Sequence, residues 1–427
     1  MARAPMPPAA RRRLSGLIID PSPLRHDRDY RLLWTGQAIS SMGRHITSVV
    51  LPYQVYVLTG DLLAVGLLSI VQLVPILVFA LGGGAVADAV DRRKLLLATQ
   101  TGLALSSLGL VALALLPAPS LLAIYAVAAL SAGLGAVDQP ARASSVPRLV
   151  PPERLPAAIS LNQVMFQASA VIGPAIGGIV LATLGIAAAY AIDVISFFAA
   201  IAALLMMQPI PPARGAARAS LSGVLEGLRF VRSRRDLLAT FVVDVNAMVF
   251  GSPRALFPAL ALDVFKVGPA GVGLMASAAG LGALIAALLT GWTGSVRRPG
   301  RAVLIAVTVW GIAIAAFGAA TFSFPLALLF LAIAAGADVV SAVVRSSMLQ
   351  VLTPDALRGR VSSIHILVVT GGPRIGDAES AAVAALVGPA ISVVSGGILT
   401  LVGLGVINLA MPEFGRLELR LDEVDAA

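Results

Sequence analysis

Cysteine is absent from this chain of 427 residues, and charged residues make up only 12% of it. Without cysteine there is no disulfide, no thiolate metal site and no cysteine nucleophile. A soluble domain carries about 25% charged residues. The scarcity of charge, together with 58% hydrophobic residues and a mean hydropathy of +0.92, therefore indicates an integral membrane protein.

Lysine is almost absent as well, because Lys94 and Lys266 are the only two and arginine supplies nearly all of the positive charge. The net charge of +9 raises the question of nucleic acid, but its distribution between apolar stretches points to a membrane and not to nucleic-acid binding. Residues 1–31 are basic and proline-rich. Their piece "LSGLIID" is too short and too polar for a signal peptide, so we expect a cytoplasmic tail.

Apolar stretches of about 20 residues, the length that crosses roughly 30 Å of hydrocarbon, recur along the chain. Hydropathy, with glycine, proline and charge clusters as breaks, predicts an all-α membrane protein with twelve transmembrane helices. The predicted helices cover residues 32–58, 62–86, 95–116, 121–141, 157–182, 185–207, 237–263, 271–293, 301–322, 324–345, 361–387 and 389–411.

Basic residues mark alternate connections between these helices. The connections assigned to the outside hold only Lys266. The connections assigned to the inside hold Arg92, Arg93, Lys94, Arg142, Arg148, Arg154, Arg214, Arg218, Arg229, Arg232, Arg234, Arg235, Arg297, Arg298, Arg301, Arg345, Arg358 and Arg360. This positive-inside pattern predicts a multi-pass protein of the bacterial plasma membrane with both termini in the cytoplasm.

An internal repeat divides the chain into two halves. Residues 144–155 ("SSVPRLVPPERL") match residues 346–357 ("SSMLQVLTPDAL"), and "GPAIGG" at 173–178 matches "GPRIGD" at 372–377. The repeat predicts two six-helix bundles around a central cavity, with substrate sites near the bilayer midplane. The predicted parts are a tail at 1–31, a bundle at 32–207, a cytoplasmic linker at 208–236, a bundle at 237–411 and a cytoplasmic tail at 412–427.

A basic loop, "GGGAVADAVDRRKLLL" at 82–97, follows the second predicted helix. It resembles the cytoplasmic loop signature of the major facilitator superfamily, G-x-L-A-D-x-x-G-R-R-K, with Val86 replacing leucine and Asp91 replacing the second glycine. The resemblance implies the major facilitator fold. It also implies a gating loop that latches the outward-facing state, with the residues Gly84, Asp88, Arg92, Arg93, Lys94 and, on the fourth helix, Asp138.

The fifth predicted helix contains "VIGPAIGGIV", which resembles the antiporter signature of exporters in the superfamily. Its motif residues are Gly173, Pro174, Gly177 and Gly178. They offer a kink and a thin face for close packing, which any packed membrane helix also uses. Over most of the chain, stretches such as "LPYQVYVLTG" (51–60) and "LTPDALRGRVSS" (352–363) are similar to the siderophore (enterobactin) exporter branch, which is intermixed with multidrug exporters.

Charged residues inside the predicted helices each cost about 2.5–3.5 kcal/mol at mid-helix, so they are expected to face the bundle interior and to serve a function. Arg374 and Asp377 are three residues apart and share one face of the eleventh helix. The fifth helix has small residues at the matching positions, so packing alone does not require these charges. The alternative is an ion pair that only fixes helix register. The candidate proton and substrate residues are Asp377, Arg374, Glu379, Arg44, Asp244 and Arg254.

The chain lacks a Walker loop, which excludes ATP as the direct fuel, and nothing in it points to a metal or an enzyme. We expect a monomeric exporter in the lipid bilayer, without a cofactor, driven by the proton gradient and specific for a small amphipathic organic molecule, either a siderophore or a drug. Asp377 is the candidate proton acceptor and Arg374 its charge partner. The arginines favour a neutral or anionic substrate, while Asp244 and Glu379 leave a cation open. The alternative function is a sensor or a lipid flippase.

Overall fold

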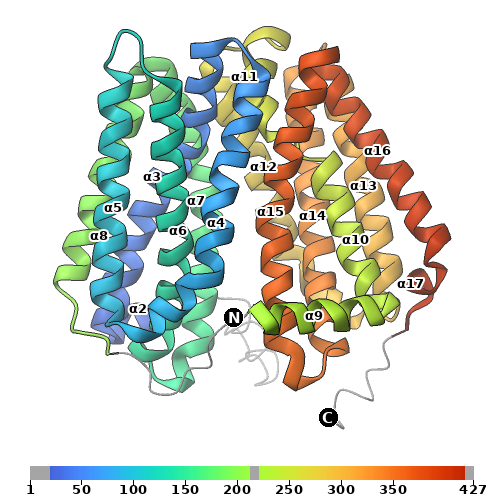
Figure 1. Cartoon of the computed structure of the whole chain (residues 1–427), viewed down its shortest axis with the longest axis horizontal. Helices are drawn as coiled ribbons and strands as arrows, with labels where there is room; N and C mark the ends of the chain where they lie inside the picture. The colour runs from blue at the N-terminus through green and yellow to red at the C-terminus, as the bar shows by residue number, and fades with distance from the viewer. Residues whose placement is uncertain (1–19, 212–220, 419–427) are drawn as a thin grey trace, which may run out of the picture.

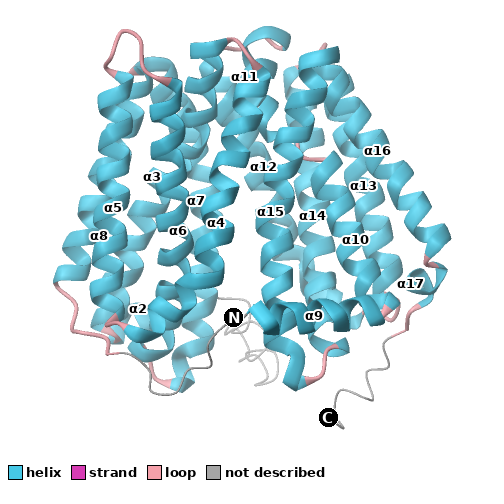
Figure 2. Ribbon diagram, in the orientation of Figure 1, coloured by secondary structure: helices cyan, strands magenta, loops and turns pink. Residues whose placement is uncertain are grey.

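A computed structural model of the chain describes residues 20–211 and 221–418. Within them, the side chains of residues 80–89, 221–225, 294–295 and 355–356 are not described. The described residues form helices joined by short connections, as Figure 2 shows. An all-α architecture is the expected outcome in a bilayer, because a helix satisfies its own backbone hydrogen bonds.

The long helices agree with the predicted ones in number and order within the described residues. The first half contains α3 (Arg28–Thr59), α4 (Leu62–Ala89), α5 (Arg92–Ala114), α6 (Leu121–Leu149), α7 (Leu155–Thr183) and α8 (Gly185–Leu205). The second half contains α10 (Arg235–Phe250), α12 (Pro269–Leu289), α13 (Pro299–Ala319), α14 (Phe324–Leu352), α15 (Asp355–Val387) and α16 (Pro389–Ala410). Shorter helices are α2 (Ser22–His26), α9 (Leu221–Ser233) and α17 (Pro412–Arg416).

The prediction of one continuous helix over 237–263 is wrong at its centre. There α10 ends at Phe250, and a short 3-10 turn η2 (Arg254–Leu256), α11 (Phe257–Ala259) and the π-helical turn η3 (Leu260–Val264) follow. Pro253 disfavours helical geometry at the residue before it and has no N–H to donate. The break places Arg254 on a bend instead of on a regular helix face.

Ten of the helices are long and apolar enough to cross a membrane, counted over the described residues. The two long helices outside this group are α3 and α15. Both are longer than 30 residues, so length is not the reason. Their apolar character is diluted by polar side chains, including Arg44 in α3 and the sequence from Arg374 to Glu379 in α15.

The two halves form two bundles that meet along two seams, which Figure 1 shows at the upper end of the molecule. In one seam α7 packs against α12, and in the other α4 packs against α15. A Cβ atom added to Gly273 of α12 would lie 2.6 Å from the Cα of Gly178 on α7. A Cβ added to Gly66 of α4 would lie 2.6 Å from the Cβ of Ala381 on α15. Small residues thus let the two bundles approach closely.

The linker between the bundles contains the amphipathic helix α9, which lies across the second bundle in Figure 1. Its buried Val231 packs with Phe241 and Val361 of the second bundle. Glu226 forms an ion pair with Arg360 at the start of α15. The helices α2, α9 and α17 all lie at the end of the molecule where the two bundles draw apart (Figure 1).

Candidate functional site

A cavity of about 470 Å³ lies between the two bundles. Helices α3, α4 and α7 supply its wall on the first half, and η2, α11, α12, α14 and α15 supply the wall on the second half. The first wall carries uncharged polar groups such as Ser48, Ser69, Gln72 and Gln167, along with His45. The charged residues on the second wall are Arg254, Asp338, Arg374 and Asp377.

Asp377 connects three elements at the edge of this cavity. One carboxylate oxygen, Oδ2, accepts a hydrogen bond of 3.2 Å from the hydroxyl of Ser69 on α4. The other, Oδ1, accepts hydrogen bonds of 3.3 Å from the Ser252 hydroxyl and 3.2 Å from the Ala255 backbone N–H. The bond to Ser69 joins the two bundles, since Ser69 belongs to the first half. The carboxylate therefore has donors on both of its oxygens.

Arg374 lines the same cavity but does not form an ion pair with Asp377. Its Nη1 donates to the carbonyl of Thr370, one turn earlier in α15, at 2.9 Å. Its Nε is buried and has no hydrogen-bond partner. Both residues line the same cavity, but their hydrogen bonds go to separate partners.

A buried trio of two acids and one arginine lies in the second bundle. Arg345 of α14 contacts Asp244 of α10 in an ion pair, and both side chains are almost completely buried. The Nη2 of Arg345 also lies 3.9 Å from Oδ1 of Asp338, whose side chain is 31% exposed. Asp338 reaches the cavity, whereas Asp244 does not line it. The candidate Asp244 is thus an internal partner of Arg345.

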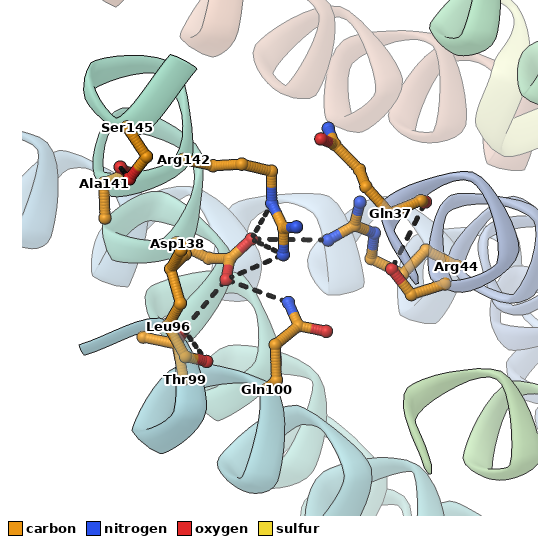
Figure 3. Close-up of polar contacts among 10 residues, drawn as sticks. Gln37, Arg44, Leu96, Thr99, Gln100, Asp138, Ala141, Arg142 and Ser145 are labelled. Atoms are coloured by element: carbon orange, nitrogen blue, oxygen red, sulfur yellow. Dashed lines mark hydrogen bonds and ion pairs between the residues drawn. The ribbon is translucent and has the colours of Figure 1, made fainter. Parts of the chain in front are cut away.

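The first bundle contains the opposite trio, with two arginines and one acid (Figure 3). Asp138 of α6 lies 3.0 Å from Arg142, one turn later, and 3.7 Å from Arg44 of α3. Thr99 and Gln100 of α5 each donate to its Oδ1 at 2.8 Å. Arg44 does not line the cavity, although its neighbour His45 does.

Within the described residues, side chains of the gating loop form contacts inside the first bundle. Asp91 accepts hydrogen bonds from the backbone N–H groups of Arg93 and Lys94 and so caps α5. Arg92 donates to the hydroxyl of Ser144 at 2.9 Å, and Arg93 donates to the carbonyl at the end of α8, Leu204. Asp138 is bonded within its own bundle, as described above. The side chain of Asp88 and the surroundings of Gly84 lie outside what the structure describes.

The antiporter-type motif of α7 contacts both bundles. A Cβ on Gly173 would lie 2.5 Å from the Cβ of His45, and one on Gly177 would lie 3.2 Å from the Cα of Ile46. Gly178 faces α12 in the seam, and Pro174 lines the cavity. The motif therefore packs α7 tightly against α3 and α12 at the same time.

Several residues in the cavity wall are not among the sequence candidates. Ser69, Gln72 and Gln167 give no signal in the sequence, because neutral polar residues occur throughout membrane helices. Asp338 does give one, since it is an acid inside a predicted span. Glu379, in contrast, is a sequence candidate that does not line the cavity, although it is partly exposed on α15.

The far end of the molecule from α2 and α9 carries a contact between the halves at its rim. The hydroxyl of Tyr56, near the end of α3, donates a hydrogen bond to the carboxylate of Asp263 on η3. Together with the two seams, this bond closes the cavity at that end.

Two bundles, a shared polar cavity and a closure at one end define a membrane transporter of the major facilitator class. The comparisons with known proteins identify the family. A model described as transmembrane secretion effector matches residues 20–423. The chain belongs to this transporter family of the major facilitator superfamily, and the family is not one of enzymes.

The curated relatives include the enterobactin exporter EntS of Shigella boydii serotype 18 and that of Escherichia coli O81. Each is 30% identical over 398 residues, which are 92% of this chain and 94% of the relative.

Solved structures share the fold at low identity. A bacterial homologue of the human lysosomal transporter Spinster, in an inward-facing and unoccupied conformation, has a TM-score of 0.71 and 14% identity, covering 92% of this chain and 98% of that one. A bacterial homologue of ferroportin in an inward-facing state has a TM-score of 0.68 and 15% identity, covering 91% and 98%. These likenesses show the major facilitator fold.

Proposed function

We propose that the protein is a secondary active exporter that moves a small amphipathic organic molecule, a siderophore or a drug, out of a bacterial cell by proton-coupled alternating access. It crosses the plasma membrane twelve times as two six-helix bundles, at 32–207 and 237–411, joined by the cytoplasmic linker 208–236. Both termini lie in the cytoplasm, following the positive-inside pattern. In this orientation the closed seams face outward, and the structure represents an inward-facing state.

The observation that carries the proposal is the position of Asp377. Its carboxylate lines the cavity and also accepts the hydrogen bond from Ser69 across the seam between the bundles. A carboxylate accepts hydrogen bonds more strongly than a neutral carboxyl group does. Protonation of Asp377 therefore weakens the contact that holds α4 against α15, which links the protonation state of this residue to the closure of the outer ends.

Proton entry supplies enough energy for export. One elementary charge moving through 100 mV releases about 2.3 kcal/mol. This energy sustains a concentration ratio of roughly fiftyfold for one substrate molecule per proton. The similarity to enterobactin exporters supports the outward direction and the size class of the substrate.

Transport in proteoliposomes tests the role of Asp377. A panel of amphipathic drugs and siderophores is offered under an imposed pH gradient, and the accumulated compound is measured. We expect Asp377→Asn to lose accumulation against a gradient while it retains exchange of substrate at equal concentrations. Export against a gradient at the wild-type rate by this variant would show that Asp377 is not the proton acceptor.

The matched control is Asp193→Asn in α8. Asp193 is also an acid inside a membrane helix, but it is buried in the first bundle, where the hydroxyls of Thr47 and Ser107 each donate to it at 2.7 Å. It does not line the cavity. We expect this variant to keep accumulation, so a loss in both variants would indicate general damage to the fold.

A further inference from the structure

The charged groups that line the cavity differ in how well they are satisfied. Both oxygens of Asp377 accept hydrogen bonds. Asp338 has a guanidinium within 3.9 Å of one oxygen. Asp377 is thus satisfied by hydrogen bonds, whereas Asp338 is paired with Arg345 by charge alone, because its buried Oδ1 makes no hydrogen bond. Asp244 and Glu379, the acids named in the sequence as possible partners of a cation, do not line the cavity.

The two arginines on the same wall have unused donors. Within residues 20–211 and 221–418, Arg254 makes no hydrogen bond or ion pair, although its side chain is exposed and lines the cavity. Arg374 uses Nη1 for a helix carbonyl and leaves its buried Nε without a partner. A buried donor without a partner costs about 1–3 kcal/mol, which a ligand acceptor recovers.

The backbone brings these arginines to the same place. Arg254 lies on the bend η2, and the N–H of the next residue, Ala255, donates to Asp377 on α15. Asp377 is less than one helical turn from Arg374. Two guanidinium groups therefore line the same cavity near one satisfied carboxylate. Guanidinium groups bind planar oxygen anions through paired hydrogen bonds.

An apolar recess adjoins this charged wall. A smaller cavity of about 70 Å³ shares Arg254, Phe257 and Asp338 with the main one. Its remaining wall is mostly apolar and includes Met248, Trp310, Ile314 and Leu331. A ligand that places an acidic group on the arginines can thus bury an apolar group beside them.

We infer that the substrate is an amphipathic organic anion whose acidic oxygen group, a carboxylate, sulfonate, phosphate or ionised phenol, binds between Arg254 and Arg374. The inference rests on the proposed function as an exporter and names its class of substrate. The membrane potential, negative inside, adds to the proton gradient, since each negative charge that leaves gains about 2.3 kcal/mol per 100 mV. Export of an anion is therefore driven by both forces.

Two dyes of nearly equal shape test the inference. 1-Anilinonaphthalene-8-sulfonate is an anion, and N-phenyl-1-naphthylamine is the same ring system without the sulfonate. Binding of each to the full-length protein in lipid nanodiscs is measured by equilibrium dialysis, with empty nanodiscs subtracted. We expect the wild type to bind the anion about tenfold more tightly, as a charge-assisted contact implies.

Variants locate the site. We expect Arg254→Gln and Arg374→Gln each to weaken binding of the anion about tenfold and binding of the neutral dye less than threefold. Arg254→Lys keeps the charge and should retain most of the preference, which separates charge from folding. Arg232→Gln, an exposed arginine of α9, is the control without effect.

Three results would overturn the inference: equal affinity of the wild type for both dyes, parallel losses of both dyes in the variants, or a preference for the anion that survives in both glutamine variants. Accumulation in proteoliposomes under a pH gradient separates this failure from that of the proposed function. If the neutral dye is accumulated and the anion is not preferred, the exporter function is supported and the inferred anionic substrate class is wrong. If neither dye nor any panel compound is accumulated, the exporter function fails.

Discussion

The two halves of the molecule use buried charge in opposite ways. In the first bundle one acid, Asp138, is held by Arg44 and Arg142, which leaves an excess of one positive charge. In the second bundle one arginine, Arg345, is held by two acids, which leaves an excess of one negative charge. Only the second trio reaches the cavity, through Asp338.

This difference shows that the repeat preserves helix positions but not chemistry. The first half presents neutral polar groups to the cavity, and the second half presents all four of the charged residues Arg254, Asp338, Arg374 and Asp377. Both seams contain closely packed small residues and one hydroxyl donor, Ser277 of α12 in the first and Ser69 of α4 in the second. They differ in the acceptor, which is the backbone carbonyl of Val171 in the first seam and the carboxylate of Asp377 in the second. The second half thus supplies the carboxylates and guanidinium groups of the cavity, and the first half supplies uncharged polar groups and His45.

The largest effect is expected from removing the central arginine of the second trio. Arg345→Met leaves the buried Asp244 and the cavity-lining Asp338 without their common partner and should lower the free energy of unfolding by about 3–5 kcal/mol. Arg142→Met should cost about 1.5–3 kcal/mol, because Arg44, Thr99 and Gln100 still satisfy Asp138. Unfolding in mixed detergent micelles measures both. Equal losses would remove the distinction between the two trios.

The next effect concerns the seam between α7 and α12. Gly273→Ala places a methyl group 2.4 Å from the carbonyl oxygen of Pro174, and overpacking of this kind costs about 1–3 kcal/mol. We expect the closed seam to open more often, measured as faster labelling of a single cysteine introduced at Val272. No other residue of the protein reacts with the thiol label, since the chain has no cysteine.

The control for this seam is Gly291→Ala, because a Cβ at Gly291 meets nothing within 4 Å. Its labelling rate should equal that of the parent protein. Unchanged labelling in Gly273→Ala would mean that the seam tolerates the methyl group and is not a tight contact.

The smallest effect is expected at the polar seam. Ser69→Ala removes one donor to Asp377 and should weaken the closed state by about 1 kcal/mol, a shift of roughly fivefold in the inward–outward equilibrium. Distance measurements between spin labels on α4 and α15 report this equilibrium. Ser48→Ala is the matched control, since the Ser48 hydroxyl lines the same cavity but bonds to its own helix at the carbonyl of His45. A shift of the same size in both variants would assign the effect to cavity polarity instead of the seam.

Much of the fold is predictable from the sequence because hydropathy, helix-breaking residues and the repeat are local signals. The order of the long helices and the shared face of Arg374 and Asp377 follow from them. The partners across helices do not, because periodicity reports which face a residue occupies on its own helix and not which neighbour it meets. Hence Ser69 as the partner of Asp377, and Arg345 as the partner of Asp244, appear only in the structure.

The hydropathy signal is weakest in helices that carry residues of the candidate site. The two long helices that fall short of the composition of a membrane span are α3 and α15, and α15 carries Arg374 and Asp377. The break after Phe250 is a similar case, since a proline in an apolar stretch reads as a tolerated kink but here ends the helix and exposes Arg254. The segments that depart from regular, apolar membrane helices in this chain are thus segments that line the cavity.

The glycine contact between α7 and α12 also bears on how this transporter can diversify. Backbone meets backbone there, so the contact has no side chain that can be exchanged without moving a helix. The cavity wall, in contrast, is made of side chains such as Gln72 and Gln167, which can be replaced singly. The range of compounds that the protein handles is therefore free to drift, while the switch that carries them across the membrane stays fixed.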